Sequence, residues 1–242
     1  MISHGRGGDV VSTHRRCRNR KEASVPTARQ KQRALRILDG LCARYPDARC
    51  ELDHDPAQPW QLLVAVVLSA QATDVSVNKV TPALFAAFPT VQAFAAAAPG
   101  DVEPYIKSIG LFRNKAKNIV AAARVVVGDF GGVVPPAREL LETLPGVGSK
   151  SAAVLVANCF GEPAIAVDTH VGRVARRLGL TRQTDPDKVE TELSALWPRE
   201  RLLQAHHTLI FQGRRICDAR RPRCSECPVA GDCRRIGVDE LA

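Results

Sequence analysis

The stretch that decides the fold reads Leu144-Pro145-Gly146-Val147-Gly148-Ser149-Lys150, and the tetrapeptide Val167-Asp168-Thr169-His170 follows it along the chain. The two glycines can take positive φ values and let another molecule approach the backbone closely. The residues after them have the pattern of a helix, whose first turn would direct unpaired N–H groups and the positive end of its dipole outward. That arrangement suits a phosphate. The stretch therefore predicts a glycine hairpin that opens a helix and binds an anion.

Lys150 would lie on the first turn of this helix, in front of the apolar run Ala152 to Ala157. We expect both surroundings to favour a neutral amine, which is the form that a nucleophile needs. Asp168 would supply a carboxylate for proton transfer, and it also fits the N-cap of a helix that starts at Thr169. A Walker phosphate loop is excluded because its lysine must follow a glycine directly. From these residues alone, Lys150 could also serve only to bind phosphate.

The bulk properties limit the class of protein without fixing it. No stretch of eighteen apolar residues occurs among the 242 residues, and the N-terminus has no apolar signal segment, so we expect no membrane span and no secretion. The net charge is +9, but residues 1–33 carry nine Lys or Arg and two Asp or Glu, which is +7 of that total. The basicity belongs mostly to a tail, so charge alone does not establish nucleic-acid binding.

Apolar residues recur at helical spacing along the rest of the chain, and no hairpin or alternating strand pattern interrupts them. The sequence therefore predicts an all-α protein. Proline in Asp185-Pro186 predicts a helix start, whereas Gly100 and Gly131-Gly132 predict ends between helices. The expected helices cover 29–45, 60–70, 74–87, 90–97, 101–107, 112–128, 137–143, 149–159, 169–178, 186–196 and 200–212.

Four of the eight cysteines crowd into one short segment, as Cys217, Cys224, Cys227 and Cys233. Four thiolates at this spacing can bind either a zinc ion or a [4Fe–4S] cluster, and the single C-x2-C unit favours the cluster. The others, Cys17, Cys42, Cys50 and Cys159, are scattered, which favours a reducing compartment over a disulfide framework. Between the first two ligands lie Arg220, Arg221 and Arg223, which suit phosphate contacts.

The hairpin with its lysine, the aspartate and the cysteine spacing together resemble the endonuclease III family of helix-hairpin-helix DNA glycosylases. The resemblance covers about Leu35 to Cys233. It implies two helical domains and a C-terminal [4Fe–4S] cluster loop. A six-helix domain with the helix-hairpin-helix would span 52–162. Residues 29–51 and 163–242 would form the cluster domain, and residues 1–28 a disordered basic tail.

The resemblance also implies an activity in base excision repair. Lys150 would attack C1′ of a flipped oxidised pyrimidine nucleotide, form a Schiff base and cut the strand by β-elimination, with Asp168 assisting. The partner would be double-stranded DNA with damaged bases or abasic sites. We expect a monomer in a bacterial cytoplasm, used at the nucleoid. A mitochondrial or nuclear protein is the eukaryotic alternative.

DNA contacts follow from the same resemblance. Gln71 would enter the gap that the flipped base leaves, and a second inserting loop, Ile109-Gly110-Leu111, would carry Leu111 at its tip. Gly146, Gly148 and Ser149 would meet the phosphates, although the family commonly has a basic residue where this chain has Ser149. The alternatives are a non-catalytic helix-hairpin-helix and iron–sulfur DNA-binding module, and a mismatch-specific glycosylase. Lys150 argues against both, since a pure binder does not need it and related adenine-mismatch enzymes lack it.

Overall fold

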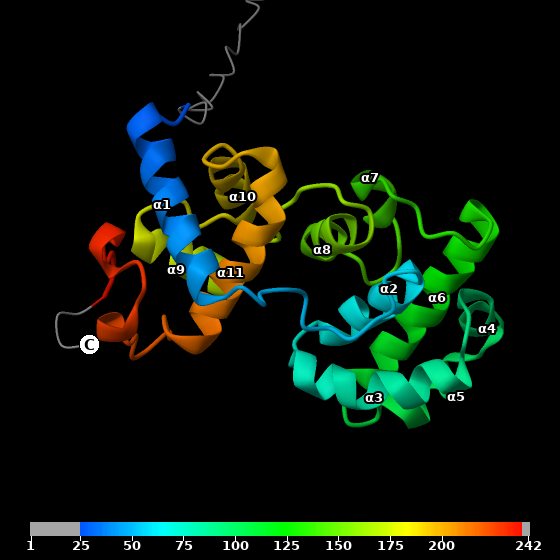
Figure 1. Cartoon of the computed structure of the whole chain (residues 1–242). Coiled ribbons are helices and arrows are strands. Elements are labelled where there is room, and N and C mark those ends of the chain that lie inside the picture. Colours follow the sequence, from blue (N-terminus) through cyan, green and yellow to red (C-terminus); the bar gives the residue numbers. More distant parts are fainter. Residues whose placement is uncertain (1–24, 239–242) are drawn as a thin grey trace, which may run out of the picture.

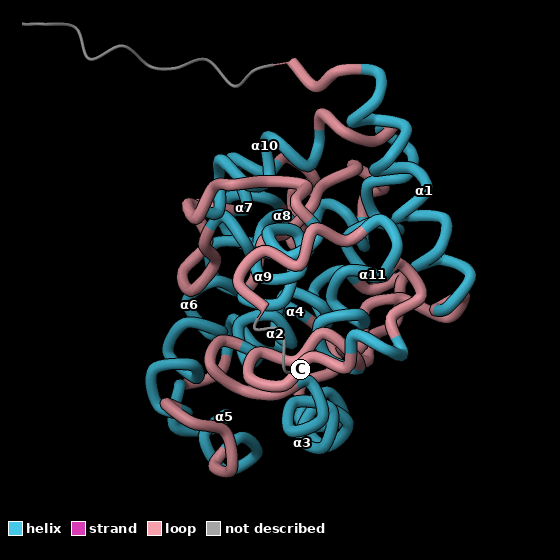
Figure 2. The backbone as a smooth tube through the Cα atoms, turned by 90° about the vertical axis from the view of Figure 1, so that its left-hand side faces the viewer, coloured by secondary structure: helices cyan, strands magenta, loops and turns pink. Residues whose placement is uncertain are grey.

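The computed structural model describes residues 25–238, and within them the regular structure is entirely helical (Figures 1 and 2). The all-α prediction is therefore confirmed. The helices are α1 (Ala28–Arg44), α2 (Pro59–Ser69), α3 (Asp74–Ala87), α4 (Val91–Ala96), α5 (Pro99–Ile106), α6 (Phe112–Phe130), α7 (Arg138–Leu141), α8 (Ser149–Cys159), α9 (Thr169–Leu178), α10 (Pro186–Ser194) and α11 (Leu202–Arg215). None of the helices in this part of the chain combines the length and the apolarity that a bilayer crossing requires.

An N-cap side chain accepts a backbone N–H at five of the eleven α-helix starts in the described residues. Thr27 forms a capping box with Gln30 at the start of α1, and Asp185 accepts from the backbone N–H of Lys188 with Pro186 in the first turn of α10. Gly131 ends α6 with a left-handed φ of 61°. The prediction that Gly100 ends a helix is wrong, because Pro99 starts α5 one residue earlier and Gly100 lies inside it. Residues 1–24 of the expected tail lie outside the described residues.

The first hydrophobic core lies among α2 to α8. Helix α2 is buried on every side from Leu62 to Leu68, as its uninterrupted apolar sequence predicts, and it packs against α3, α6 and α8. Phe94 and Ile106 from the short helices fill the same core, and both are fully buried. Helix α8 thus rests on α2, so that its first turn is held by a large apolar cluster.

The second core joins α1, the first helix, to α9, α10 and α11 near the end of the chain. Tyr45 meets Phe211 edge-on at 6.0 Å between ring centroids, and the Trp197 indole N–H donates to the Ala34 carbonyl at 2.8 Å. Figure 1 shows the two groups of helices side by side, with the chain crossing between them after α1 and again after α8. The N-terminus of α9 and the middle of α11 consequently face the helices of the first core.

Candidate active site and cluster loop

The glycine hairpin lies between α7 and α8, and two of its apolar side chains are buried in the first core. Leu144 and Val147 are 2% and 6% exposed, and the Val147 N–H donates to the Leu144 carbonyl at 3.0 Å. Gly146 has a φ of 83°, and a Cβ there would come within 2.9 Å of Asn118 Cβ, so only glycine fits. Gly148 has an ordinary φ of −98°, but open space surrounds its missing Cβ. Its backbone is therefore accessible to a ligand at the start of α8.

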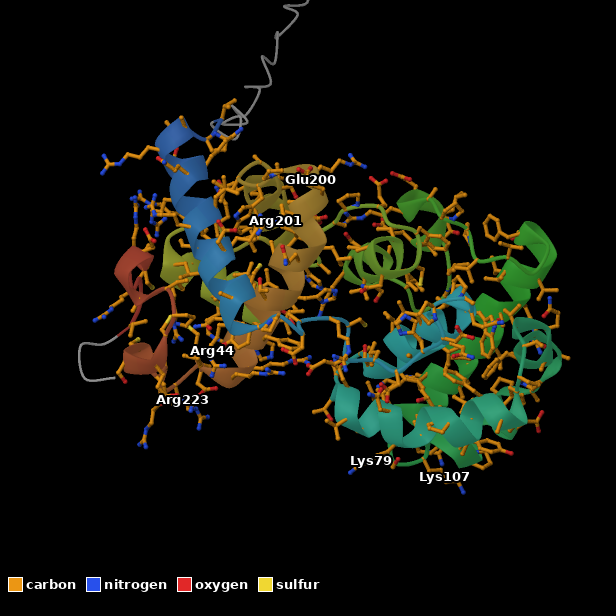
Figure 3. The ribbon with its side chains drawn as sticks, viewed as in Figure 1. Arg44, Lys79, Lys107, Glu200, Arg201 and Arg223 are labelled. Carbon is orange, nitrogen blue, oxygen red and sulfur yellow. The ribbon has the colours of Figure 1, made fainter. Side chains whose placement is uncertain are left out.

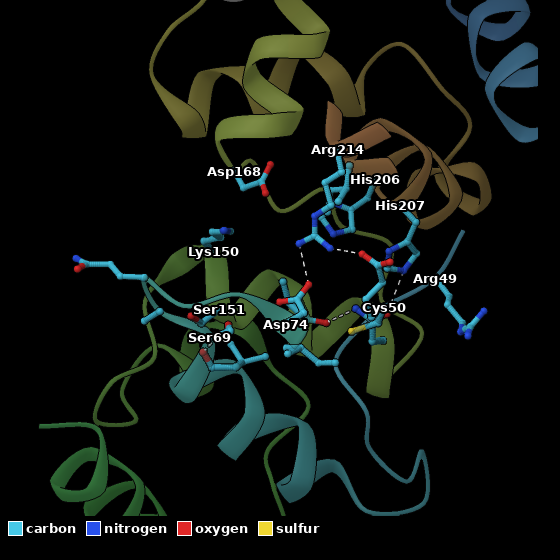
Figure 4. A pocket seen from close by; sticks show the side chains of 18 residues that line it. Arg49, Cys50, Ser69, Asp74, Lys150, Ser151, Asp168, His206, His207 and Arg214 are labelled. Atoms are coloured by element: carbon cyan, nitrogen blue, oxygen red, sulfur yellow. Dashed lines mark hydrogen bonds and ion pairs between the residues drawn. The ribbon is translucent and has the colours of Figure 1, made fainter. Parts of the chain in front are cut away.

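Lys150 is exposed on the first turn of α8, where the hairpin places it. Asp168 caps α9, since its Oδ1 accepts from the Val171 N–H at 2.7 Å. The capping role that the sequence predicts for Asp168 is confirmed. Both side chains line one cavity between the two cores, on facing sides of it (Figure 4). The structure thus brings the amine and the carboxylate to one place from two separate helix starts.

This cavity is open on one side and has a volume of about 240 Å³. Its walls come from both cores and from the first chain crossing between them. The lining residues are Arg49, Cys50, Glu51, Leu52, Val66, Ser69, Ala70, Gln71, Asp74, Lys150, Ser151, Val154, Asn158, Asp168, His206, His207, Ile210 and Arg214. Polar and apolar side chains share this lining, and the volume leaves room for a planar ring with hydrogen-bonding edges.

Two adjacent histidines in this wall were not identified from the sequence. Burial first, then His207 and Lys150, lower the pKa of His206 to about 3, and burial lowers the pKa of His207 to about 4. His207 Nε2 lies 3.1 Å from Asn158 Oδ1, whereas the buried His206 Nδ1 has no hydrogen-bond partner among the described residues. Both rings are therefore neutral at physiological pH and add no positive charge behind the lysine. The only sequence signal was the His-His pair inside the expected helix 200–212.

Arg214 also lines the cavity, and no motif in the sequence identifies it. Its guanidinium donates to Asp74 Oδ2 at 2.7 Å and to Glu51, as the dashed lines in Figure 4 show. Arg214 belongs to α11, Asp74 begins α3 and Glu51 lies in the crossing segment. The ion pairs therefore join the two groups of helices beside the cavity.

The residues expected to contact DNA lie on different parts of the surface. Gln71 follows α2, is exposed and lines the cavity, whereas Leu111 precedes α6 and is 60% exposed. Both have left-handed backbones, with φ values of 56° and 58°. Ile109 differs, because its side chain is 2% exposed and packs in the first core. It anchors the second loop from inside and offers no side-chain surface to a partner.

Ser149 is the first residue of α8, and its surroundings contain a cation despite the missing basic side chain. Arg138 of α7 donates to Ser149 Oγ at 2.7 Å, and it also holds both carboxylate oxygens of Glu190 at 2.6 and 2.9 Å. The guanidinium therefore lies at the hairpin, although its charge is shared with an acidic partner from α10.

The four clustered cysteines surround one cavity at the end of the chain, together with Val174, Arg177 and Gln212. No three His, Cys, Asp or Glu side chains of the described residues converge as they would around a single ion. Four thiol side chains around one cavity are the donor set that a [4Fe–4S] cluster uses. Gln212 Nε2 donates to Cys227 Sγ at 3.3 Å, and the Arg235 N–H lies 3.4 Å from Cys233 Sγ. Such N–H groups stabilise thiolate ligands, so the donor set fits.

Electrostatics at the cysteines point the same way. Burial, and then the other thiols, raise the pKa of Cys227 and of Cys233, so a cationic partner would favour the thiolate forms of these two side chains. The seven described cysteines are all free. Arg220, Arg221 and Arg223 are exposed on the same loop, and Arg223 projects from it (Figure 3).

Comparison with known proteins adds an independent finding. Residues 64–199 match the family described as HhH-GPD superfamily base excision DNA repair protein, and residues 217–233 match the iron–sulfur binding domain of endonuclease III. The chain is 49% identical over 207 residues to endonuclease III of Synechocystis sp., covering 85% of this chain and 94% of that protein. It is 48% identical over 198 residues to endonuclease III of Bacillus subtilis, covering 81% and 90%.

Solved structures agree with these matches. A trapped covalent intermediate of an endonuclease III with DNA superposes with a TM-score of 0.80 at 46% identity, covering 85% of this chain and 96% of that one. A thermostable thymine-DNA glycosylase superposes with a TM-score of 0.76 at 24% identity, a likeness that concerns the fold alone.

Proposed function

This chain belongs to the endonuclease III family of base excision DNA repair proteins, and on that premise we propose which residues carry the reaction and what damage it removes. The protein is a DNA glycosylase with abasic-site lyase activity, and it carries a [4Fe–4S] cluster. Cys217, Cys224, Cys227 and Cys233 would hold that cluster. Bound there, it supplies a rigid cross-link for the loop that carries Arg220, Arg221 and Arg223, which would contact phosphates.

In our proposal Lys150 is the nucleophile. Its Nζ forms a bond to C1′ of the damaged nucleotide while the glycosidic bond breaks, and the base leaves with the electron pair and a proton. The C1′–O4′ bond of the resulting aminal then breaks, with O4′ taking up a proton, and the Schiff base forms between Nζ and C1′. The Schiff base makes the C2′ proton acidic, and removal of that proton expels the 3′ phosphate by β-elimination. Supporting this role, Lys150 is the amine that the hairpin holds at the open side of the cavity.

Asp168 would accept the proton that the amine loses and stabilise the positive charge that develops on the sugar. Its position supports this, because capping of α9 fixes the carboxylate across the cavity from Lys150. The neutral His206 and His207 fit the same proposal, since a cation behind the site would oppose that developing charge.

The damage we propose is an oxidised pyrimidine in double-stranded DNA. Extruding a base from the duplex costs roughly a few kcal/mol of stacking free energy unless other groups fill the gap. Gln71 and Leu111 would fill it, while the N–H groups at Gly146, Gly148 and Ser149 would grip the phosphates beside it. The exposure of Gln71 and Leu111 and the accessible backbone of Gly148 support these roles.

The organisation and setting remain part of the proposal. We assign the six-helix domain to 52–162 and the cluster domain to 29–51 with 163–242, which is supported by the two separate cores. We further propose a monomer that acts on the chromosome in the bacterial cytoplasm, as the bacterial origin of the relatives suggests.

The observation that carries the proposal is the convergence of Lys150 and Asp168 on one cavity. The test uses matched duplexes with one oxidised pyrimidine, one 8-oxoguanine or one G·T mismatch, and measures single-turnover base release. We expect release from the oxidised pyrimidine to be fastest by at least roughly tenfold, a difference of about 1.4 kcal/mol in barrier. Asp168→Asn should slow it strongly while the protein stays folded. Faster release at the mismatch would replace this substrate with the mismatch-specific alternative.

A further inference from the structure

Two surface loops in this structure have the same unusual backbone. Gln71 lies between α2 and α3, Leu111 lies just before α6, and their φ values are 56° and 58°. Residues other than glycine rarely adopt this left-handed backbone conformation, so contacts with neighbouring structure must hold each loop in place. For the loop of Leu111, part of that support is Ile109, which is buried in the first core.

A buried lysine joins the two loops. Lys115 is on the first turn of α6 and is only 4% exposed, and its Nζ donates to the Leu68 carbonyl oxygen at 2.7 Å. Leu68 is in the last turn of α2, where carbonyls have no partner within the helix and carry the negative end of the helix dipole. The ammonium therefore satisfies the end of α2 from the start of α6.

The bond lies next to both loops along the chain. Leu68 precedes Gln71 by three residues, and the backbone N–H of Lys115 itself donates to the Leu111 carbonyl at 3.1 Å. Displacement of one helix end would thus move one loop against the other. A lysine is an expensive choice for a site this buried, and burial lowers the pKa of its ammonium. A purely apolar contact would pack the same space without that cost but would not fix the end of α2.

We propose that Lys115 is a positioning residue, which sets the separation of Gln71 and Leu111 so that both can enter the DNA stack together. The inference rests on the insertion role proposed above for these two side chains. Lys115 touches no DNA in this account and acts only through the backbone of α2 and α6.

The test compares two abasic substrates of one sequence. One is a complete duplex, whereas the other lacks the nucleotide opposite the abasic site, so its stack is already open. For Lys115→Met we expect a loss of roughly ten- to a hundredfold in single-turnover cleavage of the complete duplex, as for a small misplacement of a binding group. Cleavage of the gapped substrate should stay near wild type. Lys115→Arg, which keeps a donor, should recover part of the loss.

Lys117→Met is the matched control, because Lys117 is exposed on the same helix. This variant should cleave both substrates as the wild type does. Equal losses of Lys115→Met on both substrates, with a lowered melting temperature, would overturn the proposal in favour of a merely structural role. If Lys115→Met does not fold, Lys115→Gln gives the same comparison, since its shorter side chain cannot span the same distance.

Double variants separate this inference from the proposed function. If Lys115 acts through the loops, Lys115→Met combined with Gln71→Ala or Leu111→Ala should lose little more than the worse single variant. Fully additive losses would contradict it. If Gln71→Ala and Leu111→Ala both cleave the complete duplex like wild type, the insertion roles themselves fail. If those two are impaired and Lys115→Met is not, only the positioning role fails.

Discussion

The glycine hairpin and the cysteine loop are two irregular segments of similar importance, but different forces hold them. The hairpin rests on a continuous apolar core through Leu141, Leu144 and Val147, which are nearly inaccessible to solvent. The loop at 217–233 buries few large apolar side chains. Arginine side chains hold the backbone of this loop in place. Arg177 donates to the carbonyls of both Asp218 and Ala219, at 2.5 and 2.8 Å.

This difference shows how each segment gains its rigidity. Apolar burial is present as soon as the core folds and does not depend on a ligand. A buried guanidinium stabilises the loop only when all its hydrogen-bond acceptors are in place, and thiolates do so only when they bind the cluster. A buried polar group without a partner destabilises the fold. The hairpin should therefore keep its structure without the cluster, whereas the loop should not.

The largest expected effect comes from removing one cluster ligand. Cys224→Ser should abolish the iron–sulfur absorption near ~400 nm and remove most DNA binding, because the loop with its three arginines loses its cross-link. Circular dichroism should retain most of the helical signal from the first core. Cys42→Ser is the control, since Cys42 is a free cysteine that is not one of the four proposed ligands. Zinc instead of iron in the wild-type protein would contradict the assignment.

A smaller effect is expected from the buried arginine that holds the loop. Arg177 is 8% exposed, and Arg177→Met leaves carbonyls of the loop without donors. The free energy of unfolding should fall by about 2 kcal/mol, and the cluster should be lost faster to chelators. The exposed Arg182→Met is the control for removal of one positive charge. Chelation kinetics equal to wild type would show that the loop is held by other means.

A third prediction concerns stability in acid, and it involves His206 and His207 in the wall of the cavity that Lys150 also lines. The pKa values of His206 and His207 are about 3 and about 4 in the folded protein, below the ordinary 6.5. Between the folded pKa values and pH 6.5, the two histidines bind protons in the unfolded chain but not in the folded chain. The free energy of unfolding therefore decreases as the pH falls below about 6.5. Urea midpoints at pH 8, 6 and 5 measure the decline. In His207→Gln the decline should be shallower. An unchanged slope would show that these rings do not control acid stability.

Much of this molecule could be predicted from its sequence, because its chemistry depends on short local patterns. The all-helical fold, the hairpin before α8 and the cap at Asp168 each involve residues close together along the chain. Ion pairs and buried contacts were not predictable. Arg214 meets Asp74 across 140 positions and Lys115 meets Leu68 across 47, and no spacing rule identifies such partners. The neutral state of His206 likewise depends on burial, which only packing decides.

Gly100 and Ile109 are two positions where the prediction from sequence was wrong. A glycine between two short helical patterns indicates a boundary, but proline is a stronger helix start, and α5 begins at Pro99 instead of at residue 101. The sequence pattern places Ile109 in the inserting loop, but its side chain is buried in the first core. Position along the chain therefore located the loop, while the direction of each side chain required the fold.

Lys150 is the proposed nucleophile on which all later steps of the reaction depend, and borohydride trapping tests this role directly. The wild-type protein, incubated with duplex DNA containing one oxidised pyrimidine and then reduced, should form a covalent protein–DNA complex that survives denaturing electrophoresis. Lys150→Gln should form none while still binding the duplex, and peptide mapping of the wild-type complex should place the sugar on Lys150. A Lys150→Gln protein that still forms the complex and cuts the strand by β-elimination would contradict the central claim.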